Sequence, residues 1–146
     1  MSHESEKEYS ESVEMYLKEI YLLSRDGQPA KTGDIAERLG VSPPSVTDRV
    51  SHLGERGLIT HEKHAGAQLT TDGELLAERL LRKHCRIERF LVEHLDVEEG
   101  YHEEACRLEH AMSDEIADRL DRFVDLPDSC PDCYDPEAQH CRHLSE

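Results

Sequence analysis

The chain contains no tryptophan, and aromatic residues make up only 5% of it. No apolar run approaches the roughly 18 residues that a membrane span needs, so we expect no membrane partner. Because aromatic residues are so few, the 36% of apolar residues must build a core from Leu, Ile, Val and Ala, which favours packed helices. The first eight residues are polar and acidic, so we expect no secretory signal and a cytoplasmic protein.

The chain has too few basic residues to balance its acidic ones. There are 17 of them against 33 acidic residues, which gives a net charge of -16. Such an excess normally argues against binding a polyanion. It is also the balance expected in molar salt, where the Debye length falls to about 3 Å and like charges are screened. We interpret it as adaptation to a halophilic cytoplasm; the alternative is an acidic protein with no role in nucleic-acid binding.

Cysteine is present in an odd number. Five cysteines without a secretory signal argue against a disulfide framework. Because ten histidines and 33 carboxylates accompany them, the composition points to metal ligation. The cysteines are Cys85, Cys106, Cys130, Cys133 and Cys141.

Apolar spacing and turn residues divide the chain into four parts. Residues 1–11 are expected to form a disordered acidic arm, and residues 12–70 three helices followed by a β-hairpin. The second helix, residues 31–39, is predicted to be capped by Thr32 and ended by Gly40. The third is predicted to begin after Ser42, with two prolines in its first turn and Gly57 at its end.

Residues 71–126 are expected to form a second, helical domain, and residues 127–146 a Cys- and His-rich tail. One long amphipathic helix should run from about residue 71 to 95, and a last one from about 102 to 124. The fold class is thus mainly α, with an N-terminal winged helix-turn-helix before the helical domain. The expected apolar faces are Leu75, Leu76, Leu80, Ile87, Leu91 and Val92 on the long helix, and Leu108, Met112, Ile116, Leu120 and Phe123 on the last.

The order of helices and hairpin is typical of a winged helix-turn-helix, whose exposed helix enters a major groove about 12 Å wide. Hydroxyls at the N-terminal half of that helix can bond phosphate or base edges, and the helix N-terminus favours phosphate. Residues 42–63 are neutral in a chain of net charge -16. The alternative is a packing unit that binds no nucleic acid. The candidate DNA contacts are Ser42, Pro44, Ser45, Thr47, Asp48 and Arg49.

Potential metal ligands gather on the two long helices. His84 and Glu88 are four residues apart and share a helix face. Four more fall within an arc of roughly 100° on the last helix, beside its apolar stripe. Burying such groups unpaired is costly, and a divalent metal removes that cost. The alternative is a solvated face. The four are His102, Cys106, Glu109 and His110.

Several stretches of the sequence resemble the diphtheria-toxin-repressor and manganese-transport-regulator family of metal-dependent repressors. They are residues 14–21, 34–39, 42–47, 82–84 and, above all, 102–115, within a similarity that covers about residues 12–125. The resemblance implies a homodimer formed by the helical domain, with two winged heads on a palindromic operator of double-stranded DNA. It also implies two metal sites per subunit, a primary site of Met15, Cys106, Glu109 and His110 and an ancillary site of His84, Glu88 and His102.

Two departures from the family pattern matter. Longer members carry an SH3-like third domain that contributes ancillary ligands, whereas this chain ends at Glu146, so we expect water or the tail to complete that site. Manganese-type members have acidic residues where Met15 and Lys18 stand here. Because thioether and thiolate are soft ligands, Met15 and Cys106 favour iron(II) over manganese(II), which prefers carboxylate, carbonyl and water.

The tail carries a second candidate metal site. A C-x2-C pair followed by further His and Cys resembles a zinc site, although the spacing is short. The alternative is a flexible tail with reduced thiols. The residues are Cys130, Cys133, His140, Cys141 and His143.

These patterns and the resemblance together predict a metal-dependent, DNA-binding transcriptional repressor that controls metal-ion homeostasis. The alternative is a metal-buffering or protein-interaction module that has lost operator binding. An enzyme is not expected, because no nucleophile with an adjacent base stands out in the sequence.

Overall fold

The computed structural model describes residues 10–62, 65–126, 134–135 and 140–141. The chain forms two compact units that divide between Glu78 and Arg79. Most of the predicted acidic arm lies outside the described residues. Its last two positions do not fit the prediction, because Ser10 and Glu11 are the N-cap and first residue of a helix.

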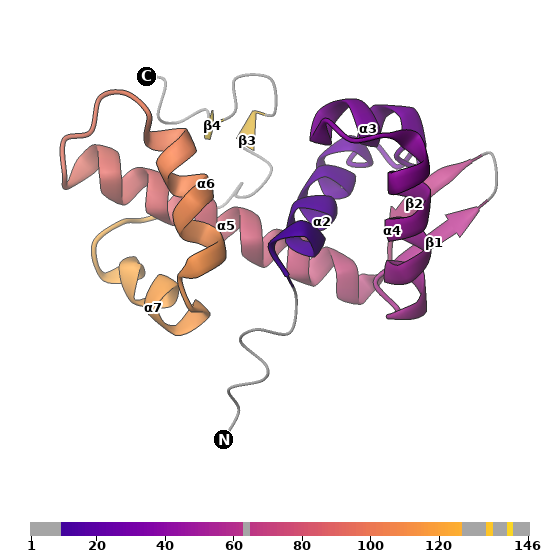
Figure 1. The fold of residues 1–146 in the computed structure, drawn as a ribbon. Helices are drawn as coiled ribbons and strands as arrows, with labels where there is room; N and C mark the ends of the chain where they lie inside the picture. Colours follow the sequence, from indigo (N-terminus) through magenta and orange to yellow (C-terminus); the bar gives the residue numbers. More distant parts are fainter. Residues whose placement is uncertain (1–9, 63–64, 127–133, 136–139, 142–146) are drawn as a thin grey trace. The chain divides into compact units, whose positions relative to one another are not determined.

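Three helices and a hairpin lie wholly within the first unit (Figure 1). They are α2 (Glu11–Leu23), α3 (Thr32–Leu39), α4 (Pro43–Glu55), β1 (Ile59–Glu62) and β2 (Gly66–Leu69). The strands pair antiparallel from Ile59 opposite Leu69 to Glu62 opposite Gly66. This is the predicted winged helix-turn-helix order. The core of the unit is aliphatic, as the composition required, with Leu17, Ile20, Ile35, Val46, Val50 and Leu53 almost fully buried.

The hairpin is fixed to the segment before α3. Ala30 and Ala67 exchange two backbone hydrogen bonds of 2.8 Å, which adds a bridge beside the hairpin. Gly66 makes this close approach feasible, because a Cβ at this position would lie 2.4 Å from the carbonyl oxygen of Ala30. Its φ of +114° is also a conformation that other residues rarely adopt.

Capping residues set the helix starts. The hydroxyl of Ser42 accepts a hydrogen bond from the backbone N–H of Ser45, so the predicted N-cap of α4 is confirmed. The predicted cap of α3 is wrong by one residue. Lys31 is its N-cap and makes no side-chain cap bond, whereas Thr32 is the first helical residue. Gly40 ends α3 in the left-handed conformation, as expected.

The second unit is built on α5 (Thr71–Glu93), whose first turns belong to the first unit, and on α6 (Tyr101–Ala111) and α7 (Asp114–Arg119) (Figure 1). A 3₁₀ turn follows over Leu120–Arg122, and two short strands, β3 (Tyr134–Asp135) and β4 (His140–Cys141), pair antiparallel. The core between α5 and α6 includes Ile87, Leu91 and Ala105. None of the helices in the described ranges is long and apolar enough to cross a membrane.

The single helix predicted over residues 102–124 is wrong. Met112 has an extended backbone, with φ -82° and ψ 133°, so α6 stops there. Ser113 begins α7 as a new N-cap, its hydroxyl accepting from the backbone N–H of Ile116. The predicted apolar stripe is therefore broken, and Ile116 and Phe123 are 50% and 56% exposed. Leu75, predicted to face the core from α5, is also exposed.

Candidate metal centre

Two adjacent helices of the second unit supply the cluster. His84 and Glu88 lie one turn apart on α5, and Glu109 lies on the last turn of α6. All three side chains are fully buried. Three buried ionisable groups are tolerated only where they pair with one another or with an ion.

The imidazole of His84 is the centre of the contacts. Its Nδ1 lies 2.5 Å from Oε1 of Glu109, and its Nε2 lies 3.0 Å from Oε2 of Glu88. One ring therefore bridges a carboxylate on its own helix and a carboxylate on α6. This contact holds the two helices together through buried polar groups.

The remaining candidates extend the cluster on both sides. Nδ1 of His102 lies 3.3 Å from Oε2 of Glu88, and Sγ of Cys106 lies 3.5 Å from Nε2 of His102. On the other side, Nε2 of His110 lies 3.3 Å from Oε2 of Glu109. His102 and Cys106 are half-buried. The six side chains that spacing selected thus form one continuous cluster rather than a solvated face.

The electrostatics of the cluster favour bound protons when no metal is present. Burial acts to lower the pKa of His84, but hydrogen bonds with Cys106 and with the two glutamates outweigh burial and raise the pKa to about 10. For His102, burial again acts to lower the pKa, whereas hydrogen bonds with Cys106 and Glu88 raise it to about 9. The negative charge of the cluster thus attracts cations, whether protons or a metal.

The donor set fits a divalent transition metal. One ligand atom each of His84, His102 and Cys106 can be chosen so that all three lie within 4.8 Å of one another. Imidazole and thiolate donors suit iron, cobalt, nickel and zinc. Carboxylates that contact ligating histidines, as Glu88 and Glu109 do here, fix the orientation of the imidazoles.

The structure does not separate the primary from the ancillary ligands, because His84 of the expected ancillary set contacts Glu109 of the primary set. Met15, the remaining member of the primary set, is half-buried on α2 in the first unit. Its role as a ligand stays a prediction. The tail site also stays a prediction, since only His140 and Cys141 of it belong to a described element, β4, and the others lie outside the described residues.

The candidate DNA contacts lie at the N-terminal half of α4. Ser42, Pro44, Ser45, Thr47 and Asp48 are exposed. The Ser42 hydroxyl caps the helix and also bonds the Ser45 hydroxyl at 2.9 Å, so it helps shape the helix start. Arg49 is half-buried, and its charge acts on the hydroxyl of Tyr16, whose pKa is raised by burial and lowered in part by Arg49.

Lys83 is a residue that the sequence reasoning did not single out. It precedes His84 on α5 and is only 5% exposed. The only signal in the sequence is its place in the stretch of residues 82–84, which carries part of the family resemblance. No periodicity rule identifies a buried lysine beside a ligand.

A winged helix-turn-helix joined to a helical unit that carries a metal-ligating cluster is the architecture of a metal-responsive regulator. Residues 8–67 match the iron dependent repressor N-terminal DNA binding domain, and residues 70–135 match the iron dependent repressor metal binding and dimerisation domain. The chain therefore belongs to the iron-dependent repressor family. This is a family of transcriptional repressors and not of enzymes, in agreement with the sequence analysis.

Known relatives give the same result. The chain is 42% identical over 118 residues to an uncharacterized HTH-type transcriptional regulator of Methanocaldococcus jannaschii, covering 80% of this chain and 94% of that protein. It is 40% identical over 115 residues to the diphtheria toxin repressor of Corynebacterium diphtheriae, covering 78% of this chain and 51% of the repressor. The structure of the manganese regulator SloR matches with a TM-score of 0.68 and 43% identity, covering 82% of this chain and 56% of SloR.

The chain thus spans about half the length of the diphtheria toxin repressor and of SloR. The halophilic interpretation of the net charge of -16 finds no support among the matched relatives.

We predict that metal binding releases protons. Ligation requires neutral imidazole, and the pKa of His84 near 10 means that its ring is charged at neutral pH without metal. Metal affinity should therefore rise with pH up to about the pKa values of His84 and His102. Calorimetric titration with cobalt(II) at pH 7, in two buffers of different ionisation enthalpy, should give roughly one to three protons released per metal.

The same pKa shift has a consequence for the stability of the metal-free protein. Because the pKa of His84 in the folded protein lies above the ordinary value of 6.5, the charged ring stabilises the fold fully below pH 6.5. This stabilisation is lost as pH rises through about 10.

In the calorimetric titration, metal binding without proton release at pH 7 would contradict the charged state assigned to His84.

Proposed function

We propose that this chain is a metal-dependent DNA-binding transcriptional repressor that binds a palindromic operator as a homodimer. The observation that carries the proposal is the buried cluster around His84, which fits a divalent metal in the same chain as a winged helix-turn-helix. The names of the matched relatives support it, because they include the diphtheria toxin repressor and a manganese regulator.

In this proposal, Met15, Cys106, Glu109 and His110 form the primary metal site, and His84, Glu88 and His102 the ancillary one. The metal would supply positive charge where two buried carboxylates converge. Bound metal would bias the conformations of the protein toward those that match two half-sites on DNA. Repression would then follow the free metal concentration.

The DNA contacts proposed are the exposed residues of the α4 N-terminal half. Their hydroxyls suit phosphate and base edges, and the helix N-terminus adds a partial positive charge. The segment 42–63 that would face DNA is neutral within a chain of net charge -16, so it would repel the phosphates less than the chain's overall charge suggests. The alternative function, metal buffering without operator binding, keeps the cluster but requires no sequence preference for DNA.

We predict that Glu109→Gln lowers metal-dependent DNA affinity by at least about tenfold, because the carboxylate that orients His84 and binds metal is lost. The measurement is an anaerobic DNA-binding titration with and without iron(II), on duplexes selected from random sequence by the unmodified protein. Glu104→Gln is the matched control, since Glu104 is on α6 but pairs with the exposed Arg107.

An unchanged metal response of Glu109→Gln would contradict the proposed site. Failure of the unmodified protein to select any DNA sequence, with metal binding intact, would favour the buffering function instead.

The homodimer has support in the exposed apolar residues of the second unit. Leu95, Ile116 and Phe123 are each at least 50% exposed there. We predict that Ile116→Asp shifts the dimer toward monomer in sedimentation velocity, because a charge would be buried in an apolar contact. Val41→Asp is the control, since Val41 is an exposed apolar residue of the first unit. An Ile116→Asp dimer as tight as the unmodified one would exclude Ile116 from the interface.

We propose iron(II), rather than manganese(II), as the signal. The thiol of Cys106 belongs to the ligand group with His84 and His102, and sulfur donors disfavour manganese(II). Met15 would add a second soft donor. Cobalt(II) and nickel(II) should bind more tightly than iron(II) by the Irving–Williams order, so selectivity in the cell would depend on availability.

We predict that Met15→Asp, alone and with Cys106→Glu, moves activation toward manganese(II), because carboxylates replace sulfur. The measurement is the free metal concentration that half-saturates DNA binding, determined anaerobically for iron(II) and manganese(II). A response of the unmodified protein to manganese(II) at lower free concentration than to iron(II) would disprove the argument from ligand softness.

A further inference from the structure

A buried lysine adds a second link between α5 and the end of α6. The side chain of Lys83 is only 7% exposed, and its ammonium donates to the carbonyl oxygen of Met112 at 2.9 Å. The same ammonium lies 2.9 Å from Oδ1 of Asp114. A buried ammonium needs such partners, because its desolvation is otherwise uncompensated.

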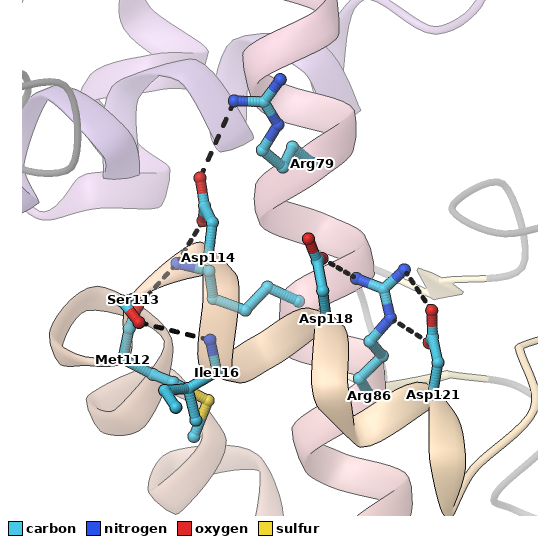
Figure 2. A network of polar contacts seen from close by, with 9 residues as sticks. Arg79, Arg86, Met112, Ser113, Asp114, Ile116, Asp118 and Asp121 are labelled. Atoms are coloured by element: carbon cyan, nitrogen blue, oxygen red, sulfur yellow. Dashed lines mark hydrogen bonds and ion pairs between the residues drawn. The ribbon is translucent and has the colours of Figure 1, made fainter. Parts of the chain in front are cut away.

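The partners of Lys83 lie where the chain turns from α6 into α7. Met112 is the C-cap of α6, and Asp114 is the first residue of α7. Figure 2 shows Asp114 at this turn, facing Arg79, whose guanidinium lies 3.7 Å away. The lysine charge therefore faces the carbonyl end of one helix and a carboxylate at the start of the next, both of which are favourable positions.

On both α5 and α6, the residues that Lys83 joins are close in sequence to residues of the buried cluster. Lys83 directly precedes His84 on α5, and Met112 follows His110 by two residues. A displacement of the α6 end along α5 would change the separation of His84 and Glu109, now 2.5 Å between Nδ1 and Oε1. Metal–ligand distances are fixed within about 0.2 Å, so this register matters for binding.

We propose that Lys83, with Asp114 and the carbonyl of Met112, is a positioning residue for the metal centre. Both of these bonds of Lys83 are to residues outside the ligand set; it acts by holding the last turn of α6, which carries Glu109 and His110, against the turn of α5 that carries His84. The inference depends on the metal binding proposed above, and it adds a determinant of affinity outside the ligand set.

The test is cobalt(II) titration of the full chain, followed by visible absorption and by competition with a chelator. Lys83→Met keeps the length and apolar packing of the side chain but removes the donor and the charge. We expect a 10- to 100-fold loss of cobalt(II) affinity, the range typical of residues that orient ligands. The absorption spectrum of the bound cobalt(II) should also change, and Lys83→Arg should recover part of the affinity.

Arg86→Met is the matched control. Arg86 lies on α5, three residues after Lys83, and pairs with Asp118 and Asp121 at 3.6 and 2.6 Å (Figure 2). It thus joins α5 to α7 and to the 3₁₀ turn that follows, and neither of these partners lies at the end of α6. The control should lose thermal stability without a change in the cobalt(II) spectrum.

If Lys83→Met does not fold, Asp114→Ala serves in its place, with an expected loss of about tenfold, because the ammonium keeps its bond to Met112 but loses its counter-charge. Unchanged affinity and spectrum in the folded variant, or the same change in Arg86→Met, would overturn the positioning role. Absence of cobalt(II) binding by the unmodified protein would instead overturn the metal site itself.

Discussion

The contact of His84 with Glu109 is the interaction on which the second unit depends. It joins α5 to α6 through two side chains that are completely buried, and Glu88 adds a second buried carboxylate to the same ring. Two carboxylates around one imidazole need positive charge. A proton on His84 supplies it in the metal-free protein, and a divalent ion can supply it when bound. The same buried contact thus packs two helices together and creates the negative charge to which a metal ion can bind.

Local chemistry explains where the sequence predicted the fold well. Ser42 with its following prolines, Gly40 and the alternating runs around the hairpin each act within a few residues, so spacing identifies them. The prediction failed where two local signals competed. Ser113, followed by Asp114 and Glu115, is a good N-cap signature, yet a continuous apolar spacing through residue 123 suggested one helix. The capping signal prevailed.

The sequence could predict which residues belong to the candidate site, but not which of them contact one another. Spacing places His102, Cys106 and Glu109 on one face of α6 and His84 with Glu88 on one face of α5. It cannot give the register between two helices, which decides that His84 meets Glu109 rather than another residue. The position of Met15 as a ligand came from family resemblance alone. Lys83 lies in a stretch that resembles the family, but neither spacing nor the resemblance gave it a role, because its burial is a property of the packed structure.

The break after α6 explains why the ligands lie where they do. Glu109 and His110 occupy the last turn of α6, and the helix stops two residues later at Met112. A continuous helix would bond the carbonyl of Met112 within itself. Because the helix ends there, the carbonyl is available to Lys83, and the new helix places Asp114 beside the same ammonium. The interruption that spacing failed to predict therefore creates the contact that fixes the ligand-bearing turn against α5.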